Sequence, residues 1–151
     1  DNEHIVGRIP ATPNSEWRFY VSRFNGRYLP QIRRWVDTED YTGYSKQGLS
    51  LEASQIPALT AAVSEACQLR NSEQETVVAK LPVSATEEIV VKVLPARRGK
   101  EACLDVRVFV HDESYQGPLK KGFRLPLERC AGVADHLKRL NDAYEAIAGE
   151  Q

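Results

Sequence analysis

The chain has 151 residues, of which 42% are hydrophobic and 27% charged, and its 20 basic and 21 acidic residues leave a formal net charge of −1. This composition predicts a globular protein of one ordinary domain or two small ones, and it excludes a disordered chain. It also excludes a simple polycation that coats DNA or an anionic membrane, because such binding needs local positive charge.

The first half of the chain predicts four strands and a helix. Apolar, aromatic and β-branched residues indicate strands at 4–9, 17–24, 27–36 and 45–51. Asn25-Gly26 is typical of a two-residue hairpin turn, because both residues tolerate positive φ. A helical stripe follows, formed by Ile56, Leu59, Val63 and Cys67. The polar residues 71–75 are interpreted as a linker.

The second half repeats this order. IVGRIP at 5–10 recurs as VVAKLP at 77–82, an offset of 72, and IRRWV at 32–36 matches VRVFV at 106–110, an offset of 74. A two-residue insertion near 95–98 explains the change of offset. Because the match keeps its register along both halves, it indicates an internal duplication rather than two unrelated amphipathic patterns.

The repeat places strands at 76–81, 89–94, 101–110 and 119–125, with a longer, basic turn at 96–100. Pro126 is expected in the first turn of the second helix, and Ala148-Gly149 at its end. The stripe of this helix consists of Leu127, Cys130, Val133, Leu137, Leu140, Tyr144 and Ile147. The predicted fold class is α+β, with two ββββα repeats at 1–72 and 73–151.

Overlaying the repeats predicts the faces of the third strand of each. In the second repeat the core face is apolar and consists of Ala102, Leu104, Val106, Val108 and Val110. The equivalent positions are Tyr28, Pro30, Ile32, Arg34 and Val36, so Arg34 is expected where the helix covers the sheet poorly or where a bulge shifts it. Trp17 and Phe19 are predicted core residues, because Ile89 and Val91 are their equivalents.

Charge is segregated along the chain. Residues 17–51 carry six basic and three acidic groups, a balance of +3, and residues 89–125 carry eight and four, a balance of +4. The four remaining segments carry −2 each. Aromatic side chains are interleaved with the basic ones, notably Phe24 between Arg23 and Arg27. Binding of single-stranded nucleic acid requires aromatic rings that stack on bases and, beside them, cations that neutralise phosphates. The alternative interpretation is that these aromatic side chains pack in the core.

Neither metal binding nor catalysis is expected. Cys67, Cys103 and Cys130 are odd in number and widely spaced, which favours reduced thiols over a disulfide or zinc site. The three histidines have no evident nucleophile partner, and no glycine-rich phosphate loop occurs. The protein is predicted to be intracellular, cytoplasmic or at the nucleoid if bacterial and nuclear if eukaryotic, with no cofactor and no membrane partner.

The stretch FYVSRFNGRYLPQIRRWVDTEDYTGYSKQGLSL resembles the positive cofactor four family of transcriptional coactivators. The resemblance rests on Val21-Ser22, the 24–27 hairpin, the 32–35 strand, the acidic loop 37–40 and the 46–51 strand, and the repeat extends it as a tandem copy. It implies curved sheets, an intramolecular pseudo-dimer of Whirly-like or Pur-alpha-like architecture, and binding of single-stranded or unwound DNA along the sheets.

By similarity, Phe24 stacks on a base and Arg23 and Arg27 flank it. The tryptophan of the family falls on Trp35 or Val36, and its lysine before the glycine falls on Gln47 in the first copy and Lys121 in the second. We expect one half richer in stacking and the other in phosphate contacts. The predicted binding residues are Arg23, Phe24, Arg27, Arg33, Trp35, Tyr41, Lys46, Arg97, Arg98, Lys100, Arg107, Lys120 and Lys121.

Two functions of different class follow. The first is a non-catalytic module that binds single-stranded nucleic acid, DNA in preference to RNA, in transcription, replication or repair. Its candidate partners are transcription or replication proteins, and further homo-oligomerisation is left open. The second is a structural or protein-interaction domain that kept the fold without the ligand. The net charge of −1, Gln47, and the acidic Glu101 and Asp105 on the expected binding face favour the second.

Overall fold

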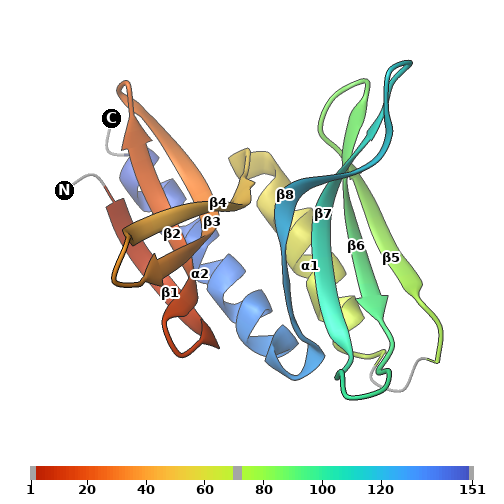
Figure 1. Ribbon diagram of the computed structural model, residues 1–151. Helices are drawn as coiled ribbons and strands as arrows, with labels where there is room; N and C mark the ends of the chain where they lie inside the picture. The colour runs from red at the N-terminus through yellow and green to blue at the C-terminus, as the bar shows by residue number, and fades with distance from the viewer. Residues whose placement is uncertain (1–2, 70–72, 150–151) are drawn as a thin grey trace.

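In the computed structural model, which describes residues 3–69 and 73–149, eight strands form two separate antiparallel sheets (Figure 1). Sheet 1 has the order β1-β2-β3-β4, and its strands are β1 (Glu3–Thr12), β2 (Ser15–Phe24), β3 (Arg27–Asp37) and β4 (Thr42–Ser50). Sheet 2 has the order β5-β6-β7-β8, and its strands are β5 (Thr76–Pro82), β6 (Glu87–Leu94), β7 (Cys103–His111) and β8 (Gln116–Pro126).

A short 3₁₀ turn and an α-helix follow each sheet. The turns are Ala53–Gln55 and Leu127–Arg129, and the helices are α1 (Ile56–Ala66) and α2 (Cys130–Ala148). The predicted α+β class with two ββββα units is therefore confirmed. Of the expected linker at 71–75, residues 71 and 72 lie outside the described residues.

Local turn chemistry accounts for the β2–β3 connection. Asn25 and Gly26 have φ values of 53° and 75°, and Phe24 pairs with Arg27 across the turn, as expected for the two-residue hairpin. Pro126 differs from its prediction. It has an extended ψ of 139° and precedes the 3₁₀ turn as its N-cap, so it ends β8 rather than opening the helix.

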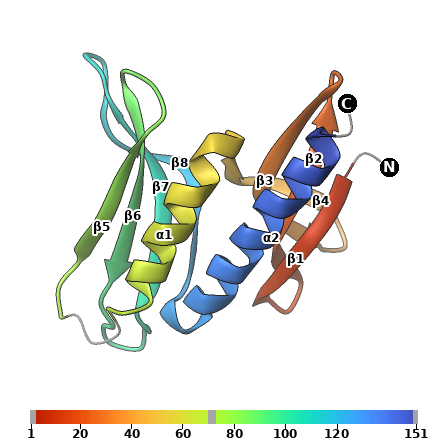
Figure 2. The ribbon, with the colours of Figure 1, turned by 180° about the vertical axis from the view of Figure 1, so that it is seen from behind.

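Each helix packs against the sheet of the other repeat. α2 packs on β1, β2 and β3, α1 packs on β5 and β6, and the two helices lie side by side (Figure 2). The His136 ring of α2 lies 5.1 Å from the Phe19 ring of β2, and a Cβ at Gly7 of β1 would collide with it. This exchange of helices between the two sheets joins both halves of the chain into one hydrophobic core.

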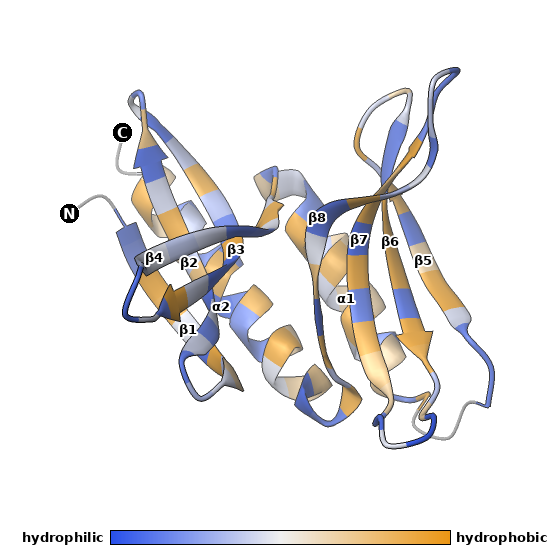
Figure 3. Cartoon of the chain, in the orientation of Figure 1, coloured by the Kyte–Doolittle hydropathy of each residue, from blue (hydrophilic) through white to orange (hydrophobic). Residues whose placement is uncertain are grey.

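The strand faces turned toward the helices supply the core, and hydrophobic residues alternate with hydrophilic ones along these strands (Figure 3). Phe19, Ile32, Leu104 and Val106 are fully buried, and Trp17 is only 6% exposed, which confirms the expected core faces of β2, β3 and β7. Both outer faces, which point away from the helices, are thereby free to carry other chemistry.

The cysteine prediction was wrong for two of the three residues. Cys67, at the end of α1, and Cys130, at the start of α2, form a disulfide, with their Cα atoms 5.6 Å apart. Sequence spacing could not show this pairing, because it depends on the two helices packing with the end of one beside the start of the other. Cys103 is a free cysteine.

Reduction of this disulfide is expected to lower the free energy of unfolding by about 4 kcal/mol, since the bond closes a loop between residues 63 apart in sequence. Urea unfolding with and without dithiothreitol measures the difference. A Cys67→Ser, Cys130→Ser double variant serves as the control, because its stability should not respond to the reductant. Equal stability of the oxidised and reduced wild-type chain would contradict the prediction.

Among the described helices, none is both long and apolar enough to cross a membrane.

Candidate nucleic-acid interface

The outer face of sheet 1 points away from α2 and is built by alternate residues of β2 and β3. Cross-strand pairs place Arg18 opposite Arg33, Tyr20 opposite Gln31 and Ser22 opposite Leu29 on this face. In Figure 1, β4 crosses in front of β2. The outer face is therefore a sheet surface partly enclosed by its own edge strand.

An aromatic and cationic cluster fills the middle of this face. The Arg18 guanidinium lies 4.0 Å from the Trp35 ring centroid and 5.7 Å from that of Tyr44, and the Tyr20 and Tyr44 rings stack at 4.6 Å. Arg18 also donates to Glu16 at 2.6 Å. Trp35 thus faces outward, as predicted, but Arg18 already covers one side of its ring.

Burial shifts the pKa values of the side chains in this cluster. It raises the pKa of Tyr44 to about 12, with Glu3 adding to the effect and Arg18 opposing it, and burial also raises the pKa of Tyr20. Burial disfavours the charge on Arg18, but its hydrogen bonds with Glu16 and Tyr44 outweigh that and raise its pKa. At neutral pH the cluster therefore contains two neutral hydroxyls and one cation, which is paired with the Glu16 carboxylate.

A hollow with a volume of about 450 Å³ extends from this cluster to the tip of the β2–β3 hairpin; we call it the hairpin hollow. Its lining residues are Glu3, Tyr20, Ser22, Arg23, Phe24, Leu29, Gln31 and Tyr44. Phe24 is 68% exposed, and the Arg23 guanidinium lies 5.6 Å from the Tyr28 ring. Of the residues predicted to bind, the structure places Arg23 and Phe24 together here.

Two other predicted residues of sheet 1 have structural partners. Arg27 pairs with Glu52 at 3.2 Å, and both side chains are well exposed. Tyr41 is 53% exposed, and its hydroxyl donates to the Tyr44 carbonyl at 2.6 Å. In sheet 2 the Tyr115 hydroxyl donates to the Pro118 carbonyl at the same distance. The repeated tyrosine therefore holds the loop before β4 and β8.

Arg33 and its repeat partner Arg107 brace the edge strands. Arg33 donates to the Lys46 carbonyl at 3.4 Å, and Arg107 donates to the Leu119 carbonyl at 3.2 Å. Both sit beside a register irregularity, and next to each a glycine, Gly48 or Gly122, approaches the neighbouring strand so closely that a Cβ would collide with its backbone. Each guanidinium therefore uses part of its hydrogen-bonding capacity to hold the irregular edge strand.

A second hollow lies where the two sheets meet, and we call it the junction pocket. It has a volume of about 250 Å³. Its lining residues are Arg33, Lys46, Gly48, Leu49, Ser50 and Gln55 of the first repeat and Val83, Glu87, Ile89, Val108 and Lys121 of the second. Arg33, Lys46 and Lys121, predicted separately in the two repeats, are thus brought to one place, and Lys46 and Lys121 are exposed.

The two hollows adjoin through one side chain. Gln31, which lines the hairpin hollow, accepts hydrogen bonds from Arg33 at 3.1 Å and from Ser50 at 2.7 Å, and both of these line the junction pocket. Together they form a path from the hairpin tip across the outer face of sheet 1 to the junction of the sheets.

On the outer face of sheet 2, acidic side chains form ion pairs with several of the basic side chains. Asp105 is 4% exposed and lies 3.4 Å from Arg107 and 3.0 Å from Arg124. Lys92 lies 4.8 Å from the Phe109 ring centroid and pairs with Glu75 at 3.1 Å. These pairs leave this face with fewer free cations than its sequence suggests.

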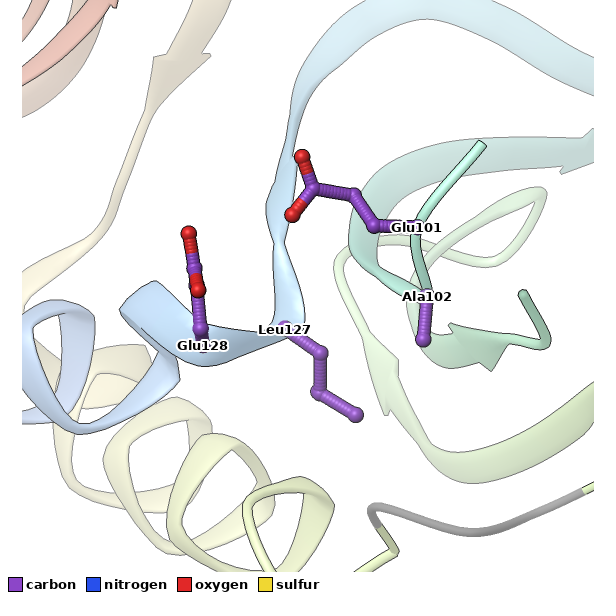
Figure 4. Close-up of a pocket in the computed structure, with 4 residues that line it drawn as sticks. All are labelled: Glu101, Ala102, Leu127 and Glu128. Atoms are coloured by element: carbon purple, nitrogen blue, oxygen red, sulfur yellow. The ribbon is translucent and has the colours of Figure 1, made fainter. Parts of the chain in front are cut away.

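The remaining predicted residues lie apart from the path. Arg97, Arg98 and Lys100 are exposed at the β6–β7 hairpin, which Figure 1 places at the end of the molecule opposite to the β2–β3 hairpin, and Lys120 is exposed on β8. A pocket of about 290 Å³ near this hairpin is lined by Glu101, Ala102, Leu127 and Glu128 (Figure 4). Its two carboxylates make it unfavourable for a phosphate.

Arg34 keeps its predicted place on the core face of β3, opposite Trp17. Its guanidinium reaches the rim, where it donates to the Ser15 hydroxyl at 3.1 Å and to the Gln47 side-chain oxygen at 2.9 Å. The pairing of β3 with β4 is irregular between Arg33 and Trp35, but the pairing of β3 with β2 is regular at Arg34, so no bulge shifts Arg34 off the core face.

Within residues 3–69 and 73–149, no group of three or more histidine, cysteine, aspartate or glutamate side chains is placed to hold a metal ion.

No family model matches the chain, and no curated protein matches it. Among solved structures, WHY3 from Arabidopsis thaliana is similar over 97% of this chain and 92% of its own, with 12% sequence identity and a TM-score of 0.37.

Proposed function

We propose that this protein binds single-stranded nucleic acid, with DNA as the first candidate, along the outer face of sheet 1. The observation that carries the proposal is the hairpin hollow, where an exposed phenylalanine, an arginine and the partly exposed Tyr44, which stacks on the buried Tyr20, share one concave surface. Bases stack on such rings irrespective of sequence, and each stacked base contributes roughly 1–3 kcal/mol.

Cations along the path supply the phosphate contacts. Arg23 is at the hairpin tip, and Lys46 and Lys121 are exposed at the junction pocket. The helices and connections carry the acidic excess, which repels a polyanion from the rest of the surface. The near-neutral chain therefore combines a local basic path with repulsion elsewhere, which favours moderate and salt-sensitive affinity.

The resemblance to the positive cofactor four family supports the same reading, since its motif residues Phe24 and Arg23 lie in the hairpin hollow. The role that follows is that of a non-catalytic binding module in transcription, replication or repair, with a tandem copy in place of a dimer.

A fluorescence titration of the intact chain with labelled oligothymidylate tests the proposal. Contacts from Arg23, Lys46 and Lys121 predict that log affinity falls with log salt with a slope of about −2, at ~0.7 per phosphate neutralised on a single strand. Parallel titrations with RNA and duplex DNA of the same length measure the preference. Absence of binding at low salt would exclude this function and favour a protein-interaction domain.

A further inference from the structure

The two repeats differ at the place where their sheets meet. The repeat offsets make Ile89, Val108 and Leu49 of the junction pocket equivalent to Trp17, Arg34 and Phe123 on the opposite side of the pseudo-two-fold axis. In each of the three pairs, the junction pocket has an aliphatic side chain where the opposite side has a larger side chain.

The opposite side is occupied by those larger side chains. The rings of Trp17 and Phe123 lie 6.0 Å apart across the junction, and both residues are buried. Arg34 extends beside them to Ser15 and Gln47. The equivalents of these two polar partners are Glu87 and Lys121, which line the junction pocket instead. One side of the pseudo-dimer is thus closed, and the other is open.

The open side has the chemistry of a site for a single base. Its floor is aliphatic, from Ile89, Val108 and Leu49, and Glu87 offers a carboxylate that can accept from a base N–H. Lys46 and Lys121 stand at the pocket as point charges suited to the adjoining phosphates. Its volume of about 250 Å³ lies below the roughly 300–1,000 Å³ of drug-sized ligand sites, which fits one base rather than a larger group.

We propose that the junction pocket takes one base turned out of the bound strand, and that the chain therefore binds one strand rather than two strands related by symmetry. This inference rests on the proposed function. The hairpin hollow adjoins the pocket through Gln31, so a strand stacked on Phe24 can reach the pocket along the outer face of sheet 1.

An abasic scan tests the inference. Octathymidylates that each lack one base are titrated against the intact chain, with complete octathymidylate as the reference. Loss of a base that stacks at the hairpin is expected to weaken binding. Loss of the base at one further internal position is expected to weaken it at least about fivefold, the lower end of what one buried base contributes. Val108→Arg gives the pocket the arginine that its equivalent position, Arg34, has on the closed side. In this variant, loss of the base at that internal position should no longer weaken binding, and circular dichroism monitors the folding of the variant.

Lys121→Gln keeps the test decisive if Val108→Arg does not fold, because Lys121 is exposed. It should reduce the salt slope by about 0.7, one phosphate contact, whereas the matched control Lys80→Gln, exposed on β5, should leave the slope unchanged. Binding of one octamer per chain is expected.

The outcomes separate the two proposals. Tight binding in which no position depends on Val108 or Lys121, or binding of two octamers per chain, overturns the inference and leaves the proposed function standing. Absence of any binding to the complete octamer overturns both.

Discussion

Expressed separately, fragments 1–72 and 73–151 are expected not to fold as monomers. Each fragment lacks the helix that covers its own sheet, because α2 packs on sheet 1 and α1 packs on sheet 2. α2 alone contributes Val133, Leu137 and Leu140 to the core, all fully buried. Loss of one such side chain costs about 1–5 kcal/mol, so loss of the whole helix exceeds the ~5–15 kcal/mol that stabilises a typical domain.

Co-expression of the two fragments should restore the fold. Under oxidising conditions the Cys67–Cys130 disulfide would join them covalently, so the pair would migrate as one species on a non-reducing gel. Circular dichroism and urea unfolding of the single fragments and of the pair measure the effect. Cooperative unfolding of either fragment as a monomer would show that the exchange of helices does not hold the protein together.

Phe24→Ala is expected to weaken binding of oligothymidylate by about 1–3 kcal/mol, which is roughly five- to 150-fold. The ring is 68% exposed at the hairpin tip and lines the hairpin hollow, so its removal takes a stacking surface from the ligand and little from the core. Thermal unfolding should therefore be nearly unchanged.

Two further variants sharpen this prediction. Phe24→Trp keeps an aromatic surface and should retain the affinity. Val77→Ala removes an exposed apolar side chain from β5 and should have no effect on binding. If Phe24→Ala binds as tightly as the wild-type chain, Phe24 lies outside the site.

The order of strands and helices could be predicted from the sequence because its signals are local. The Asn25-Gly26 turn, the period-two strands and the duplicated pattern each depend on neighbours along the chain. The exchange of helices could not be predicted in the same way, since an apolar stripe such as that of α2 indicates that a helix is buried but not against which sheet. The disulfide was missed for the same reason.

The candidate site was predicted in part. Phe24 and Arg23 lie together, as the hairpin motif suggested. Tyr20 and Tyr44 were missed, although alternation along β2 places Tyr20 on the face opposite to Phe19. Arg107 was predicted as a binding residue, and in the structure it pairs with the buried Asp105. The meeting of Lys46 with Lys121 required the tertiary arrangement.

The most direct test of the central claim is an NMR titration that maps amide shifts in the intact chain as oligothymidylate is added. The claim predicts shifts concentrated at the β2–β3 hairpin, at Gln31 and Tyr44 on the outer face of sheet 1, and at Lys46 and Lys121, with the acidic pocket at Glu101 and Glu128 unchanged. Shifts confined to the outer face of sheet 2, or to the helices, would contradict it.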